Sequence, residues 1–218
     1  MVGKYVSLGL LIVLSIVHII SLCIQNRKMK SITKIFILPL IISFYLFSVS
    51  TINWLLLSAL ICGWIGDLIL IPRNKKVMTI GGIFFGAEQV LLATTLAMKI
   101  AYQNISIALP IVIPFLYAIF TFIYLWFFLK KHVKTPTFII GNAYLMSNGV
   151  TNAMAMCLLI SNPCLNTALI FVGTTCFYLS DMILIYSRMT GSKKLDPKHI
   201  FVMITYIIAQ FLITFGLI

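Results

Sequence analysis

Long runs of apolar residues fill almost the whole chain of 218 residues. A helix needs about 20 predominantly apolar residues to cross the hydrocarbon layer of a bilayer. The runs lack the alternating apolar and polar residues of an outer-membrane barrel strand. They cover residues 5–24, 35–50, 53–72, 78–98, 106–129, 137–160, 167–187 and 200–217. The sequence therefore predicts an all-α integral membrane protein with eight transmembrane helices.

The composition excludes an ordinary soluble domain. Charged residues make up 9% of the chain and hydrophobic residues 61%, whereas a soluble domain carries about 25% charged residues. The connections between the runs are short, so we expect residues 1–218 to form a single transmembrane domain. The first run is about 20 residues long and is not followed by an A-x-A site, which favours a retained helix over a signal peptide.

The basic residues gather in alternate connections, and this pattern predicts the orientation. Only Lys4 and Lys99 fall outside the connections that follow the first, third, fifth and seventh runs. The residues in those connections are Arg27, Lys28, Lys30, Lys34, Arg73, Lys75, Lys76, Lys130, Lys131, Lys134, Arg188, Lys193, Lys194 and Lys198. The positive-inside rule places these connections in the cytoplasm and both termini on the other side of a bacterial inner membrane or an endoplasmic-reticulum membrane. Topology thus explains the net charge of +12 without a nucleic-acid partner.

Two stretches of the chain nearly repeat each other around an aspartate. C-G-W-I-G-D-L-I-L-I contains Asp67, and C-F-Y-L-S-D-M-I-L-I contains Asp181. An even number of predicted helices separates them, so the two stretches run in the same direction, and we expect both carboxyl groups about 6–9 Å inside the cytoplasmic boundary. The pattern predicts two parallel four-helix repeats, 1–104 and 105–218, related by an axis along the membrane normal.

Acidic residues inside the predicted helices indicate a site. A carboxylate in the hydrocarbon layer costs about 2.5–3.5 kcal/mol on insertion scales, and such residues usually face the bundle interior or a water-filled cavity. Asp67, Glu88 and Asp181 are three of the four acidic residues and all lie in apolar runs. Other polar residues recur near them, namely Gln89, Tyr144, Asn148, Ser180, Tyr206 and Gln210. We predict a polar pocket that opens toward the cytoplasmic leaflet, although such groups also serve as hydrogen bonds between helices.

Metal and nucleophile chemistry have little support in the sequence. The three histidines and five cysteines do not form the clustered spacing of a zinc site. We expect His18 to be a packed or interfacial residue. Ser180 precedes Asp181 but is not part of a G-x-S-x-G motif, so we expect it to be a hydrogen-bond partner.

Six segments in order resemble the YhhN-like family of membrane lysoplasmalogenases. The segments are T-K-I-F-I-L-P-L at 33–40, G-D-L-I-L at 66–70, G-I-F-F-G-A-E-Q-V-L-L at 82–92, A-Y-L-M-S-N-G-V-T-N-A at 143–153, G-T-T-C-F-Y-L-S-D-M-I-L-I at 173–185 and M-I-T-Y-I-I-A-Q-F-L-I at 203–213. The chain departs from the family at Gln89, where histidine is usual, and at Leu92, where tyrosine is usual. Glu88 is an alternative group for moving protons there.

The resemblance implies hydrolysis of the vinyl-ether bond of lysoplasmalogens to a fatty aldehyde and a glycerophospho-ethanolamine or -choline. It implies a lysophospholipid substrate, contact with bilayer lipid, and neither a metal nor an organic cofactor. Vinyl-ether hydrolysis needs a proton donor and a base, and general acid–base catalysis by two carboxyl groups supplies both. We expect Asp181 to be the acid and Asp67 the ionised partner.

Two other functions fit the same residues. Intramembrane carboxylates in parallel repeats also occur in proton-coupled or lipid transporters. A non-catalytic lipid-binding protein is the third interpretation.

Overall fold

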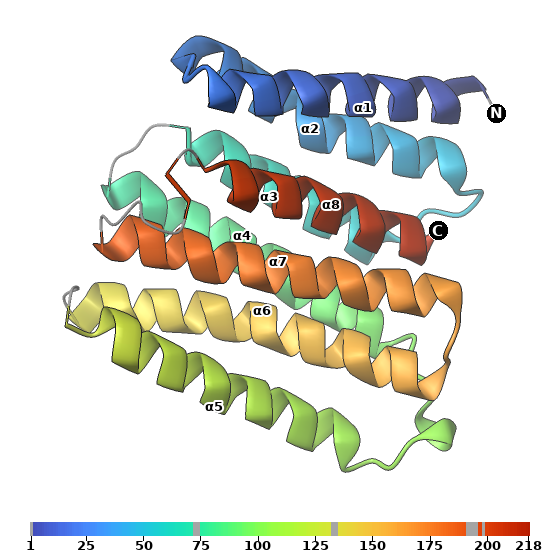
Figure 1. The fold of residues 1–218 in the computed structure, drawn as a ribbon. Coiled ribbons are helices and arrows are strands. Elements are labelled where there is room, and N and C mark those ends of the chain that lie inside the picture. The colour runs from blue at the N-terminus through green and yellow to red at the C-terminus, as the bar shows by residue number, and fades with distance from the viewer. Residues whose placement is uncertain (1, 72–74, 132–134, 191–195, 198) are drawn as a thin grey trace.

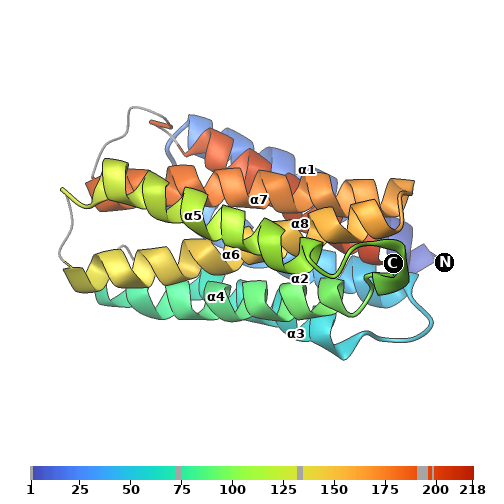
Figure 2. The same cartoon turned by 90° about the horizontal axis from the view of Figure 1, so that it is seen from below.

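The computed structural model describes residues 2–71, 75–131, 135–190, 196–197 and 199–218, and within them the chain forms eight α-helices aligned along one direction (Figures 1 and 2). The helices are α1 (Val2–Cys23), α2 (Arg27–Ser48), α3 (Trp54–Ile69), α4 (Lys75–Ala97), α5 (Leu109–Leu129), α6 (Thr135–Ser161), α7 (Leu165–Thr190) and α8 (Ile200–Leu217), with a 3₁₀ turn η1 (Tyr102–Asn104) before α5. The predicted all-α class is confirmed.

Seven of these helices are long and apolar enough to cross a membrane, and α3 is shorter. The sequence predicted a full span over 53–72, but α3 has 16 residues, which gives a length of about 24 Å. Its first residue is fixed by Asn53, whose side chain accepts hydrogen bonds from the backbone N–H groups of Leu55 and Leu56. Pro72 follows in the sequence, and a proline disfavours the helical conformation at the residue before it. The apolar run is therefore longer than the helix.

The second helix begins earlier than the apolar run predicts. Asn26 accepts a hydrogen bond from the backbone N–H of Met29 and caps α2, which starts at Arg27 rather than near residue 35. Side-chain caps of this kind satisfy N–H groups that a helix start leaves without partners. Lys30 and Lys34, which the sequence assigned to a connection, therefore lie within the first two turns of α2.

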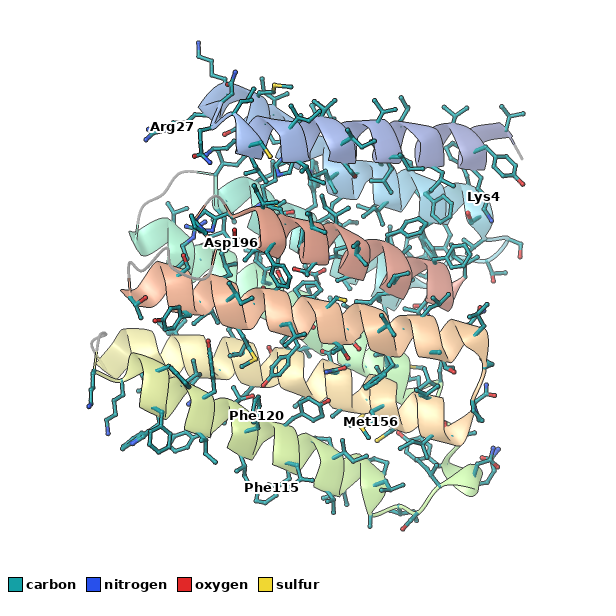
Figure 3. All side chains as sticks on the ribbon, viewed as in Figure 1. Lys4, Arg27, Phe115, Phe120, Met156 and Asp196 are labelled. Atoms are coloured by element: carbon teal, nitrogen blue, oxygen red, sulfur yellow. The ribbon has the colours of Figure 1, made fainter. Side chains whose placement is uncertain are left out.

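The odd-numbered helices end, and the even-numbered helices begin, at the same end of the bundle. α1, α3, α5 and α7 end there and α2, α4, α6 and α8 begin there, while the N- and C-termini lie at the opposite end (Figure 1). Arg27 marks the first end and Lys4 the opposite one (Figure 3). We call the first the basic end, because the basic connections of the sequence belong to it. Its cytoplasmic location and the relation between halves 1–104 and 105–218 stay predictions.

The helices that contribute to the site described below pack against one another. α8 packs against α7 and also contacts α1 and α2, and α4 packs against both α3 and α6. Large apolar side chains cover the outside of the bundle; Phe115 on α5 is 64% exposed and Phe120 is 53% exposed (Figure 3). Polar groups such as Asn148 and Gln210 are buried. This inside–outside distribution fits a lipid surround.

A glycine sets the close contact between α7 and α8. A Cβ atom at Gly173 would lie 3.0 Å from the backbone nitrogen of Ile213 and 3.1 Å from the carbonyl oxygen of Ala209. Backbone atoms do not move aside as a flexible side chain does, so a Cβ atom at this position would require α7 and α8 to shift apart by a few tenths of an ångström.

We predict that Gly173→Leu forces α7 away from α8 and lowers stability by about 1–3 kcal/mol, as overpacking of a well-packed core does. The matched control is Gly86→Leu on α4, where the space around the Cβ position is open to 4 Å. The thermal unfolding midpoint in detergent should fall for Gly173→Leu and stay near the wild-type value for Gly86→Leu. Equal midpoints for the two variants would contradict the close packing.

Candidate functional site

Both intramembrane aspartates line one pocket near the basic end of the bundle. Asp67 on α3 is 2% exposed and Asp181 on α7 is 3% exposed, and the pocket that they share has a volume of about 130 Å³. Its wall also includes Tyr144 from α6, Tyr206 from α8 and Lys34 from α2. Two residues 114 positions apart in the sequence are thus brought to the same pocket, as the matching frames predicted.

Asp67 is held by a cation and a phenol. The ammonium group of Lys34 lies 2.9 Å from Oδ1 of Asp67, and the hydroxyl of Tyr206 donates a hydrogen bond of 2.7 Å to Oδ2. The Lys34 side chain is 21% exposed and the Asp67 side chain 3%, so the pair is largely removed from solvent. Lys34 and Asp67 thus form an ion pair that joins α2 to α3.

Asp181 is held by neutral groups. The hydroxyl of Tyr144 and the side-chain amide of Asn148 both donate to Oδ2 of Asp181, the amide over 2.6 Å. Both donors come from α6, and their spacing of four residues puts them on one face of that helix. The two aspartates therefore have different electrostatic surroundings, although their sequence frames match.

Phe85 of α4 contacts both tyrosines. Its ring lies 6.4 Å from the Tyr144 ring and 6.5 Å from the Tyr206 ring, both in edge-on geometry. A Cβ atom at Gly66 would lie 2.8 Å from the Phe85 ring. The glycine before Asp67 thus gives Phe85 room to reach the tyrosines that bind the two carboxyl groups.

Glu88 lies one helical turn deeper than Phe85 and does not line the pocket. It is fully buried, and the side-chain amide of Gln210 donates a 2.5 Å hydrogen bond to its Oε1. Gly63 makes room for it, because a Cβ atom there would lie 2.6 Å from Oε2. Oε2 of Glu88 and Oε1 of Gln210 have no hydrogen-bond partner in the described part of the chain. Glu88 and Gln210 thus form a second buried polar layer behind the aspartates.

Two further predicted residues make hydrogen bonds that join neighbouring helices. Ser180 lines the pocket, but its hydroxyl donates to the carbonyl oxygen of Val202 over 3.0 Å and so ties α7 to α8. The carbonyl oxygen of Gln89 accepts a 2.9 Å hydrogen bond from Thr151, and its side-chain nitrogen has no partner among the described residues. Gln89 does not line the pocket, whereas Ser180 does.

Several pocket residues were not among the predicted site residues. Lys34 is the most important of them, because it pairs with Asp67. Asn26, which caps α2, is the feature of the sequence that could have predicted it, because a helix that starts there has Lys30 and Lys34 on one face. His18 also lines the pocket, and its Nδ1 lies 2.7 Å from the hydroxyl of Thr33. Arg188 of α7 completes the basic part of the wall. Over the described ranges, no group of three or more His, Cys, Asp and Glu residues has the arrangement of a metal site.

We predict that Lys34→Met destabilises the protein by about 3–5 kcal/mol, because it leaves a buried carboxylate without its cation. Asp67→Asn should cost less, because Lys34 retains access to solvent. The double variant should recover most of the loss of Lys34→Met, since no buried charge remains unpaired. Unfolding midpoints of the four proteins test this cycle, and simple additivity of the single effects would contradict a direct pairing.

Comparison with known proteins identifies the family of the chain. Searches of curated proteins and of solved structures gave no match. The family model described as "YhhN family" matches residues 29–217, which include both aspartates, all but the first two residues of α2, and every helix from α3 to α8. The chain therefore belongs to the YhhN family.

Proposed function

We propose that the protein is a lysoplasmalogenase-like hydrolase, which cleaves the vinyl-ether bond of a lysoplasmalogen to a fatty aldehyde and a glycerophospho-ethanolamine or -choline. The YhhN family includes lysoplasmalogenases. The observation that carries the proposal is a pair of buried aspartates in one pocket, of which Asp67 has an ammonium partner and Asp181 has neutral donors. This difference suits one carboxyl group to the role of the acid and the other to the role of the base.

The chemistry of vinyl ethers needs both groups. Protonation of the alkene carbon remote from the oxygen produces an oxocarbenium ion at the adjacent carbon, and water then attacks that carbon. An acid must deliver the first proton at neutral pH, and a base must accept a proton from water. A neighbouring carboxylate also stabilises the cation, because charge that develops in a buried site is strongly influenced by fixed charges around it.

The contacts support a division of roles. Lys34 is the counter-ion of Asp67, and a carboxylate paired with an ammonium group is suited to the role of the base. The donors to Asp181 converge on Oδ2, so a proton on Oδ1 leaves both hydrogen bonds intact. Asp181 is therefore the proton donor, as expected from the sequence, and Tyr144 and Asn148 are its positioning residues.

The protons balance over the cycle. Asp181 transfers its proton to the alkene carbon, and Asp67 accepts a proton as water adds to the oxocarbenium carbon, which gives a hemiacetal. Asp67 then protonates the glycerol oxygen, the carbon–oxygen bond breaks, and the hemiacetal hydroxyl returns its proton to Asp181. The net reaction consumes one water molecule, and both aspartates regain their starting state.

Basic residues suit the phosphate of the substrate. Lys30 on α2 and Arg188 on α7 line the same pocket as the aspartates, and charge-assisted hydrogen bonds from such groups are strong phosphate contacts. They belong to the end of the bundle that the positive-inside rule predicts to be cytoplasmic. A headgroup at that surface would leave the vinyl ether near the aspartates.

Purified protein in detergent should release aldehyde from a vinyl-ether lysolipid and not from its saturated alkyl-ether analogue. Asp67→Asn and Asp181→Asn should each lower kcat by about 10²-fold or more, the usual contribution of a general acid or base. In D₂O the aldehyde should carry one deuterium on the carbon next to the carbonyl, because that carbon receives the acid's proton. Product measured by trapping the aldehyde checks all three results.

A matched pair of tyrosine variants controls for damage to the fold. Tyr144→Phe removes a donor to Asp181 and should lower kcat, whereas Tyr45→Phe removes a hydroxyl that bonds the backbone nitrogen of Asn53 at the opposite end of α2 and should not. Lack of vinyl-ether turnover, or turnover that survives in the double Asp→Asn variant, would refute the hydrolase. A transporter would instead give no product in detergent and a flux that needs sealed vesicles.

A further inference from the structure

We infer that the hydrocarbon chain of the substrate occupies a second, apolar pocket that adjoins the aspartate pocket between α4, α6 and α7. This inference rests on the proposed function and adds the part of the site that receives the chain. The second pocket has a volume of about 80 Å³. Its wall includes Gly82 and Phe85 of α4, Ile140 and Tyr144 of α6, and Ile185 of α7. We refer to it as the chain pocket.

The chain pocket and the aspartate pocket share their wall. Leu70, Phe85, Tyr144, Leu184 and Arg188 line both. The two spaces are therefore neighbours on either side of the same side chains. We therefore place the polar part of the substrate beside the aspartates and its chain in the adjoining apolar space.

The lining of the chain pocket suits an aliphatic chain. Most of its side chains are hydrocarbon or aromatic, and ligand pockets with such walls gain affinity chiefly from buried apolar area. Ile83 on α4 is 63% exposed and Ile139 on α6 is 60% exposed, so the surfaces of the two helices that flank the pocket are themselves apolar. A chain longer than the pocket can therefore continue along a surface that faces lipid.

The position of Tyr144 orients the substrate. Its ring lines the chain pocket, and its hydroxyl donates to Asp181. Asp67, Lys34 and Asp181 all line the aspartate pocket and not the chain pocket, so the hydrogen bond from Tyr144 is what joins Asp181 to the chain pocket. The alkene carbon attached to the chain, which receives the proton, therefore lies toward Asp181. The ether carbon, which water attacks, lies toward Asp67. This orientation rests on the hydrogen bond between Tyr144 and Asp181 and agrees with the roles assigned from the contacts of the carboxyl groups.

Two glycines on α4 allow a clean test. The Cβ positions of Gly82 and Gly86 both have no heavy atom within 4 Å, so larger side chains at either position meet open space. Gly82 lines the chain pocket and Gly86 does not. Gly82→Leu therefore places four carbons in the space proposed for the substrate chain, and Gly86→Leu makes the same chemical change one turn away on the same helix.

The experiment measures kcat/KM for a short-chain and a long-chain vinyl-ether lysolipid. The wild-type protein, Gly82→Leu and Gly86→Leu are each assayed with both substrates. Gly82→Leu should lower the ratio of long-chain to short-chain kcat/KM by about tenfold or more, the scale on which pocket volume discriminates between apolar substrates. Gly86→Leu should keep the wild-type ratio. An unchanged ratio in Gly82→Leu, or an equal loss on both substrates, would overturn the chain pocket while the hydrolase stands.

A binding measurement separates failure of the chain pocket from failure of the proposed reaction. A vinyl-ether lysolipid with a photoreactive diazirine in its chain is cross-linked to the Asp67→Asn/Asp181→Asn protein, and the labelled peptides are identified. Gly82→Leu or Gly86→Leu is then introduced into this double variant. Labels on α4 and α6 that decrease with Gly82→Leu, and not with Gly86→Leu, support the chain pocket even if wild type shows no turnover. Labels that lie elsewhere, or that do not respond to Gly82→Leu, contradict it.

Discussion

Carboxyl groups buried among apolar helices need partners from other helices, and this requirement ties the bundle together near its basic end. Asp67 of α3 takes Lys34 from α2 and Tyr206 from α8. Asp181 of α7 takes Tyr144 and Asn148 from α6. Five helices are thus joined through two residues. Removal of any partner would leave a polar group exposed to a low-dielectric interior, where each unsatisfied group is costly.

Small residues give these polar groups the space they need. Gly66 makes room for Phe85, which contacts both tyrosines, and Gly63 makes room for the carboxyl group of Glu88. Both glycines are on α3 and both partners are on α4, three residues apart in each helix. In the G-D pair of the sequence, Gly66 therefore serves packing and Asp67 makes polar contacts.

The apolar runs predicted the helices well, because membrane spans are specified by length and hydropathy. The frames around Asp67 and Asp181 likewise predicted a shared pocket. Details that depend on helix ends were missed: Asn26 caps α2 early, so Lys34 is a helical residue that reaches Asp67. Asp67 lies two residues from the end of α3, whereas Asp181 lies nine from the end of α7, so the equal distance from the helix ends that the frames predicted was wrong. The position of Glu88 behind the pocket required knowledge of how α4 packs on α3.

The difference between the two aspartates is the feature that turns a buried polar cluster into a candidate catalytic pair. Infrared spectroscopy of protein with isotope-labelled aspartate distinguishes a protonated carboxylic acid from a carboxylate. At neutral pH, wild type should show one protonated-carboxyl band in the aspartate region that disappears in Asp181→Asn and persists in Asp67→Asn. A band that instead disappears in Asp67→Asn, or that is absent from wild type, would contradict the assignment of the proton to Asp181.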